Sequence, residues 1–169
     1  FQLVSVNTAR YDTTKHLATP VISDAKVGLQ HISEALGEWR APDSWYQRAI
    51  KERDEWDAYV KKQSGPTNQE EPSYAHAVGA VYRNSDPSDI VVTAAGGLVG
   101  EVVQVWKPRQ LNTFETEWGF SCMGYEISGA LGIKMAKPDQ DVVVFVGDGS
   151  YLLSNSDIYS SVLYGQKLI

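Results

Sequence analysis

A short apolar run that ends in a Gly-Asp-Gly-Ser turn carries the residues best suited to chemistry in this sequence. Residues 142–146 are apolar and mostly β-branched, and Gly147, Asp148, Gly149 and Ser150 follow them directly. An apolar run of this length, bounded by glycine, predicts a parallel strand buried on both faces. The glycines allow a sharp turn close to a ligand, and Asp148 places a hard carboxylate oxygen at the carboxyl end of the strand. The turn is therefore a candidate site for a divalent metal that holds a diphosphate.

Polar residues downstream of this turn indicate where the next helix begins. Ser154, Asn155, Ser156 and Asp157 are residue types that start helices. We expect the free N–H groups of that helix to point toward the turn, where they would favour an anion. Gly-Asp-Gly-Ser also suits a turn without any ligand, so turn chemistry alone leaves both alternatives open.

A second motif lies upstream of the turn and resembles a known family. Residues 118–136 read WGFSCMGYEISGALGIKMA, and a Lys-Pro-Asp turn joins them to the strand. With the Gly-Asp-Gly-Ser turn, this segment resembles the diphosphate-binding domain of thiamine diphosphate enzymes of the acetolactate synthase and pyruvate decarboxylase type. The Ser-Cys-Met-Gly-Tyr-Glu-Ile, Lys-Met-Ala and Gly-Asp-Gly-Ser-Tyr-Leu segments are similar to the trihydroxycyclohexanedione hydrolase family of inositol catabolism. The resemblance covers nearly the whole chain, but only a part of such an enzyme.

The resemblance implies which residues hold the phosphates of thiamine diphosphate. Asp148 matches the ligand of Mg²⁺, and a second ligand, an asparagine, is expected beyond Ile169. Asn155 is too close to Asp148 to replace it. The glycine pattern after residue 95 is by itself only a strand-to-helix turn, but the resemblance places it against the diphosphate. The residues that match phosphate-binding positions are Gly96, Gly97, Leu98, Gly149 and Ser150.

The resemblance also implies how the rings of the cofactor are held. Met123 matches the apolar wedge that bends the cofactor, and the Ser121 carbonyl and Met123 N–H match the groups that hold the aminopyrimidine. On spacing alone, Met123 also suits core packing at a helix start. No base accompanies Cys122 in the sequence, so we expect a small buried residue there rather than a nucleophile.

No residue of this chain is expected to be catalytic. In the family, the glutamate that activates the cofactor comes from the amino-terminal domain of a neighbouring subunit. We therefore predict that Glu115, Glu117 and Glu126 are surface groups or form local pairs, with Glu117 near enough to the motif to face the substrate. The implied reaction is hydrolytic C–C cleavage of a cyclic 1,2-dione to a 5-deoxy sugar acid, for which the cofactor supplies the difficult chemistry. The chain alone is expected to be inactive.

Two other functions stay open at this point. An acetolactate-synthase-like decarboxylase or carboligase would use the same cofactor. The Glu-Ile-Ser-Gly run after Met123-Gly124-Tyr125 differs from the Gly-Leu-Pro-type run usual in those enzymes. A non-catalytic phosphate-binding α/β module would need only the glycine turns.

Composition excludes some classes of protein. The 169 residues carry a net charge of −6 and a pI near 5.0, with no basic stripe for nucleic acid. Cys122 is the single cysteine, so the chain has no disulfide framework. The apolar runs are too short to cross a bilayer. We expect a cytoplasmic enzyme with a small-molecule substrate, which is a homodimer or homotetramer at full length. His16, His31 and His76 are expected at the surface or in packing, because no ligand partner stands at suitable spacing.

The predicted fold class is α/β, with a parallel sheet flanked by helices. Residues 1–40 are expected to be the tail of a Rossmann-like central domain, residues 41–72 a helix and linker, and residues 73–169 a truncated diphosphate-binding domain. The sequence starts and stops inside predicted strands, which indicates a fragment of a longer polypeptide. The predicted strands are residues 2–6, 20–22, 89–93, 111–113, 142–146 and the last four residues. The predicted helices are residues 24–36, 42–62 and 73–84, a short helix that residues 102–106 finish, and a segment after Met123.

Side-chain patterns on two of these helices predict how they pack. An apolar face at steps of about four residues runs along residues 42–62, with charge pairs 51–55 and 57–61 on the exposed face. A ridge of small residues on the helix after Met123 predicts close packing against a sheet or another helix. The predicted apolar face consists of Trp45, Ala49, Trp56 and Val60. The ridge consists of Ser128, Gly132 and Ala136.

Overall fold

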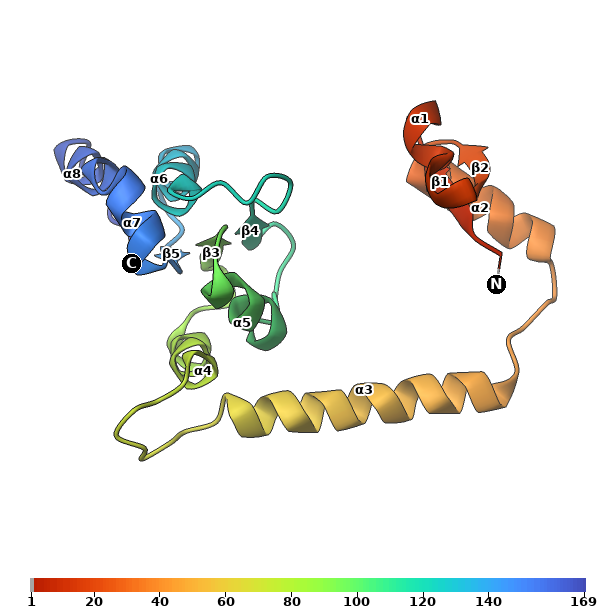
Figure 1. Cartoon of the computed structure of the whole chain (residues 1–169), viewed down its shortest axis with the longest axis horizontal. Coiled ribbons are helices and arrows are strands. Elements are labelled where there is room, and N and C mark those ends of the chain that lie inside the picture. Colours follow the sequence, from red (N-terminus) through yellow and green to blue (C-terminus); the bar gives the residue numbers. More distant parts are fainter. Residues whose placement is uncertain (1) are drawn as a thin grey trace. The chain divides into compact units, whose positions relative to one another are not determined.

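The computed structural model describes residues 2–169. The chain divides into two compact units, residues 1–51 and 52–169. The division falls inside α3 (Asp43–Gln63), so this helix contributes residues to both units (Figure 1). The units contain parallel sheets and helices, which confirms the predicted α/β class. The boundaries predicted at residues 40 and 72 stay predictions.

The first unit is a two-stranded parallel sheet with short helices. Its strands β1 (Val4–Asn7) and β2 (Thr19–Ile22) pair in register from Val4 opposite Thr19. The connection between them contains α1 (Arg10–Thr13) and a 3₁₀ turn (Lys15–Leu17). After β2, the Asp24 carboxylate accepts hydrogen bonds from the N–H groups of Lys26 and Val27, which caps α2 (Ala25–Leu36). The predicted helix 24–36 is thereby confirmed.

A three-stranded parallel sheet forms the centre of the second unit. Its order is β4 (Phe114–Thr116), β3 (Ile90–Thr93) and β5 (Val142–Val144). Val91 lies opposite Phe114 on one side and Val143 on the other. Because all strands are parallel, their carboxyl ends lie at the same edge of the sheet. The last residue, Ile169, also exchanges backbone hydrogen bonds with β5.

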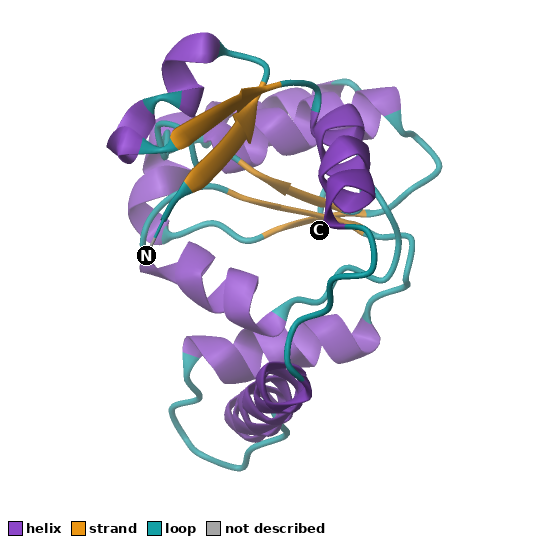
Figure 2. Ribbon diagram, turned by 90° about the vertical axis from the view of Figure 1, so that its right-hand side faces the viewer, coloured by secondary structure: helices purple, strands orange, loops and turns teal. Residues whose placement is uncertain are grey.

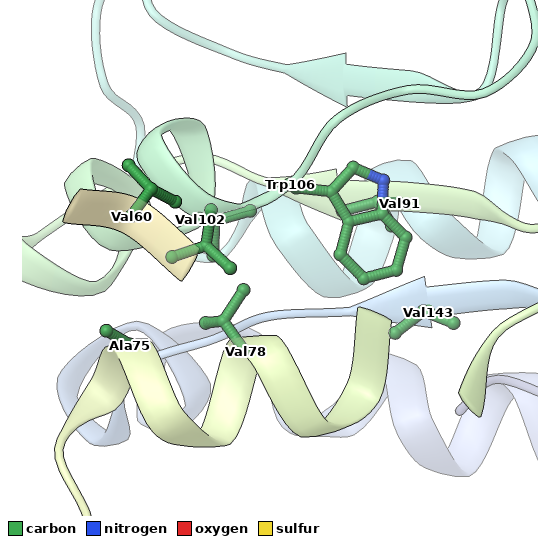
Figure 3. Packing of buried hydrophobic residues seen from close by; sticks show 8 residues of the cluster. Val60, Ala75, Val78, Val91, Val102, Trp106 and Val143 are labelled. Carbon is green, nitrogen blue, oxygen red and sulfur yellow. The ribbon is translucent and has the colours of Figure 1, made fainter. Parts of the chain in front are cut away.

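Both faces of β3 are buried against different clusters. One cluster joins Val91 to side chains from α4 (Tyr74–Asn84) and α5 (Gly97–Val105), and Val78 of α4 points toward Val102 of α5 (Figure 3). The other joins Ile90 and Val92 to Ala130 of α6 (Tyr125–Ala136). Helices therefore lie on both sides of this sheet (Figure 2). Burying each such valine stabilises the fold by roughly 1.5–3 kcal/mol.

Two histidines are exposed and the third caps a helix. His16 and His31 are exposed, as predicted. His76 forms a capping box with Ser73, in which Ser73 N–H donates to His76 Nδ1 and His76 N–H donates to Ser73 Oγ. Within residues 2–169, no helix is long and apolar enough to cross a membrane.

Two elements differ from the predictions. The strand predicted at residues 111–113 is wrong, because Asn112 turns the chain with a φ of 60° and β4 starts only at Phe114. The prediction that residues 102–106 finish a short helix is confirmed, since α5 runs from Gly97 to Val105. The helix start predicted at residues 154–157 is confirmed by α8 (Ser156–Leu163), but a helix that was not predicted, α7 (Asp148–Ser154), begins directly at the Gly-Asp-Gly-Ser turn.

Asn155 precedes α8 without the capping role that its residue type suggested. It has a helical φ of −62° and no side-chain capping hydrogen bond. The reason is that α7 and α8 follow each other almost directly, so Asn155 continues a helical backbone instead of entering from an extended one.

The predicted packing faces are only partly correct. On α3, Val60 is buried, but Trp45 and Trp56 are 66% and 48% exposed. The Asp57 carboxylate pairs with Lys107 at 2.6 Å, which ties α3 to the segment after α5. On α6, the ridge of Ser128, Gly132 and Ala136 is exposed, so its predicted packing is wrong. The buried face of α6 consists of Glu126, Ile127, Ala130 and Lys134.

Candidate cofactor site

A pocket opens at the carboxyl ends of β3 and β5, where the strand-to-helix turns meet. It encloses about 580 Å³ of space, part of it open to solvent. Of the residues predicted to bind cofactor or metal, all except Ser121 line it. The lining residues are Tyr74, Ala95, Gly96, Gly97, Leu98, Met123, Gly147, Asp148, Gly149 and Ser150.

The turn between β3 and α5 forms one wall of this pocket. Gly96 precedes α5 with a φ of 82°, a conformation that favours glycine. A Cβ placed on Gly96 or Gly97 would meet no atom within 4 Å, so the backbone is open toward the pocket. No side chain caps α5. The N–H groups of its first turn can therefore receive an anion.

The Gly-Asp-Gly-Ser turn forms the opposite wall. Asp148 is exposed at the start of α7, and its Oδ1 accepts a hydrogen bond from Gly149 N–H at 2.8 Å. Within the described residues 2–169, no cluster of three or more His, Cys, Asp or Glu side chains is arranged to hold a metal. A metal at this turn would therefore take Asp148 as its carboxylate ligand and other oxygen atoms as the rest.

Met123 contacts the same turn from the side of α6. Its side chain is 51% exposed and lines the pocket. A Cβ built on Gly149 would lie 3.2 Å from Met123 Cε, so the thioether end lies directly against the Gly-Asp-Gly-Ser turn. The alternative prediction, that Met123 packs in the hydrophobic core, is therefore wrong. Asp148 and Met123, which are distant in sequence, share one hollow.

Glu117 organises the loop that leads to Met123. Its Oε2 accepts from Cys122 N–H at 2.7 Å and its Oε1 accepts from Phe120 N–H at 2.9 Å. These two hydrogen bonds, with that from Cys122 the stronger cause, lower the pKa of the Glu117 carboxyl. Glu117 is therefore a local pair, as predicted, and it is not among the residues that line the pocket.

Cys122 and Ser121, in the same loop, do not lie where the sequence predicted. Cys122 is exposed, so its predicted burial is wrong. Its N–H donates a hydrogen bond to the half-buried Glu117 of the same loop. Ser121 is exposed with a φ of 52°, and it does not line the pocket.

The pKa of Tyr125, at the start of α6, is raised. Partial burial is the larger cause, and the nearby Glu115 carboxylate is the next.

Glu126 is the functional residue that the sequence reasoning missed. It was predicted to be a surface group or a local pair, but its side chain is fully buried. Oε1 accepts from Ala95 N–H at 3.1 Å, and Oε2 accepts from Gly124 N–H at 3.0 Å and from Ser150 Oγ at 2.6 Å. The signal that could have found it is its position four residues before Ala130, on the face of α6 that meets the sheet.

The family comparison agrees with the position of this pocket. Residues 94–169 match the model of the thiamine pyrophosphate enzyme C-terminal TPP binding domain. The matched segment begins at the turn after β3 and includes Met123 and the Gly-Asp-Gly-Ser turn. The predicted resemblance to thiamine diphosphate enzymes is thereby confirmed.

Several curated proteins that are similar to nearly the whole chain share one name. The chain is 32% identical to the 3D-(3,5/4)-trihydroxycyclohexane-1,2-dione hydrolase of Geobacillus thermodenitrificans, over 99% of this chain and 29% of that protein. It is 34% identical to the protein of that name from Clostridium tetani, over 99% of this chain and 30% of that protein. The chain thus spans about 30% of the length of these relatives.

Proposed function

We propose that the polypeptide containing this chain is a thiamine diphosphate- and Mg²⁺-dependent hydrolase. Its substrate would be a cyclic 1,2-dione, the trihydroxycyclohexanedione of the named relatives, cleaved at a C–C bond to 5-deoxy-glucuronate in inositol degradation. The observation that carries this proposal is the pocket shared by Met123, Asp148 and the two glycine turns, inside a thiamine pyrophosphate enzyme domain. The similarity to hydrolases along 99% of the chain supports the substrate class.

The residues around the pocket fit the phosphate end of the cofactor. The exposed Asp148 carboxylate would bind Mg²⁺, which prefers oxygen ligands. The uncapped amino end of α5, at Gly97 and Leu98, would face the phosphates. The Ser150 hydroxyl is already bonded to Glu126 and Gly124, so Ser150 would offer its main-chain N–H instead.

Met123 fits the ring end of the cofactor. Its half-exposed thioether lies against Gly149 and provides an apolar surface beside the polar turn. In this position it would support the rings and exclude water from one side of them. Thiamine diphosphate, when bound, supplies the nucleophilic carbon for attack on a carbonyl of the dione. The chain's own residues bind and orient it.

The remaining parts of the proposal concern the whole protein. The enzyme would act in the cytoplasm, in carbohydrate metabolism. A small polyol dione as its substrate agrees with the names of the relatives. The full-length enzyme would be a homodimer or homotetramer, in which a neighbouring subunit completes the active site. A second metal ligand and the activating glutamate would come from parts of the enzyme outside this chain.

The test uses calorimetry and turnover with the full-length polypeptide. It should bind thiamine diphosphate with Mg²⁺ in preference to ADP, and it should turn over the cyclic dione rather than pyruvate. Equal affinity for ADP would favour a general phosphate module, and turnover of pyruvate would favour a decarboxylase or carboligase. Either result would contradict the proposed function.

Asp148→Asn tests the metal ligand with little change in volume. Because the variant loses the carboxylate, we expect Mg²⁺-dependent binding of thiamine diphosphate to weaken by roughly tenfold or more. Asp139→Asn is the matched control, since Asp139 is also exposed but lies in the turn before β5. Equal affinities of the two variants would show that Asp148 holds no metal.

A further inference from the structure

Glu126 is a buried carboxylate whose partners are hydrogen-bond donors. Its side chain has no exposed area, and the three donors are Ala95 N–H, Gly124 N–H and the Ser150 hydroxyl. A buried carboxylate is costly unless hydrogen bonds to it are complete. Here both oxygens are satisfied, and the position at the second residue of α6 adds the favourable field of the helix amino end.

The three donors come from the three walls of the pocket. Ala95 lies in the turn before α5 and precedes Gly96. Gly124 follows Met123 directly and is the residue before α6. Ser150 lies in the turn that contains Asp148, and its Oγ also accepts from Gly124 N–H at 2.7 Å. One side chain thus joins segments that are 31 and 24 residues away from it in sequence.

Capping of α6 explains only one of these contacts. The hydrogen bond from Gly124 N–H to Oε2 is the kind that a glutamate in the first turn makes to the residue before its own helix. The bonds from Ala95 and Ser150 contribute nothing to that helix end. They connect α6 to the other two turns instead, and both turns line the pocket.

We propose that Glu126 is a positioning residue, which sets the spacing between the three walls of the pocket through one carboxylate. The inference rests on the proposed function, because it concerns the site for thiamine diphosphate. Loss of this connection would leave the Met123 wall and the Asp148 wall held by fewer contacts, chiefly the hydrogen bond from Gly124 N–H to Ser150 Oγ, so they could move apart more easily. Binding of a ligand that touches both walls would then require ordering them again, at a cost in affinity.

The variant Glu126→Gln keeps the size of the side chain and removes one acceptor. Its amide oxygen can still accept from Ala95 N–H, but its NH₂ group would face the N–H of Gly124. Glu126→Asp keeps the charge on a side chain one methylene shorter, which cannot reach Ala95 and Ser150 together. Both variants should therefore loosen the connection without a large hole in the core.

Lys134 provides a matched control on the same helix. It is also buried, and its Nζ donates to the carbonyl oxygens of Pro138 and Gln140 at 3.0 and 2.6 Å. These contacts tie the other end of α6 to the turn before β5, and none of the three residues lines the pocket. Lys134→Met therefore removes buried hydrogen bonds from α6 without touching the pocket walls.

The experiment measures amide hydrogen exchange without cofactor, and then the Kd for thiamine diphosphate at saturating Mg²⁺, in the full-length polypeptide. In Glu126→Gln, exchange at Ala95 and Gly124 should accelerate about tenfold or more, and the Kd should rise by a similar factor. In Lys134→Met, the exchange rates and the Kd should both stay within about twofold of the wild-type values, although the melting temperature falls.

Ser150→Ala is the second variant, which keeps the test decisive if Glu126→Gln fails to fold. Like Glu126→Gln, it should accelerate exchange at Gly124 and raise the Kd. The effects of the two substitutions should not be additive. Unchanged exchange and Kd in Glu126→Gln, or an equal loss of affinity in Lys134→Met, would overturn the inference. A wild type that fails to bind thiamine diphosphate would instead overturn the proposed function, and the exchange data would still decide the role of Glu126.

Discussion

Gly124 is a position where an added methyl group should be strongly unfavourable, and its effect can be worked out from the structure. Its φ is 92°, which side chains with a Cβ rarely adopt. A Cβ would also lie 2.5 Å from Ser154 Oγ and 3.1 Å from Ser154 Cβ. The backbone contribution for alanine is about 1–2 kcal/mol, and overpacking adds roughly 1–3 kcal/mol. Gly124→Ala should therefore lower the free energy of unfolding by about 2–5 kcal/mol.

The assay is urea or thermal unfolding of the polypeptide that contains the chain, in parallel with two further variants. Gly132→Ala is the matched control on the same helix, because a Cβ there meets no atom within 4 Å. It should stabilise the protein by roughly 0.5–1 kcal/mol, since alanine favours a helix interior over glycine. Adding Ser154→Ala to Gly124→Ala removes the hydroxyl and should recover part of the loss.

Two results would refute this reasoning about Gly124. The first is a Gly124→Ala variant as stable as the wild type, which would mean that the turn before α6 accepts a side chain. The second is an equal loss in Gly132→Ala, which would show that α6 is sensitive to any added methyl group rather than to this site. A complete lack of recovery with Ser154→Ala would show that the contact with the Ser154 hydroxyl contributes nothing to the loss.

Two further predictions concern the pocket and the loop beside it. Gly149→Ala adds a Cβ at 3.2 Å from Met123 Cε, so calorimetry should show that thiamine diphosphate binds roughly threefold to tenfold more weakly. The melting temperature should be at or above that of the wild type, because α7 gains an alanine. An unchanged affinity would contradict the contact between Gly149 and Met123. Hydrogen bonds from Cys122 and Phe120 hold the pKa of Glu117 below its ordinary value of 4.5, so they stabilise the loop above that pH and are lost as the pH falls through the lowered pKa. Trp118 fluorescence between pH 7 and 3 should report this loss, and Glu117→Gln should abolish the transition; an identical transition in that variant would assign it elsewhere.

Local signals in the sequence determined most of the elements and the place of the site. Asp24 and Gly37 bound α2 as their residue types predicted. The apolar run before Gly147 forms β5 of a parallel sheet. Because the carboxyl ends of parallel strands meet at one edge, the turns after β3 and β5 could be expected to form one pocket. The structure brings Asp148 and the glycines of both turns together there.

Tertiary packing decided which faces are buried and which polar groups meet. On α6, residue types favoured the ridge around Gly132, but the sheet contacts the face of Ala130 instead, and Glu126 is buried with it. A carboxylate two residues after a glycine has the same local pattern in water or in a core. Its burial is possible only because Ala95 and Ser150 supply donors from distant parts of the chain. Such donors meet only after the sheet has formed, because hydrogen bonds to a buried charge depend on long-range placement that no local pattern contains.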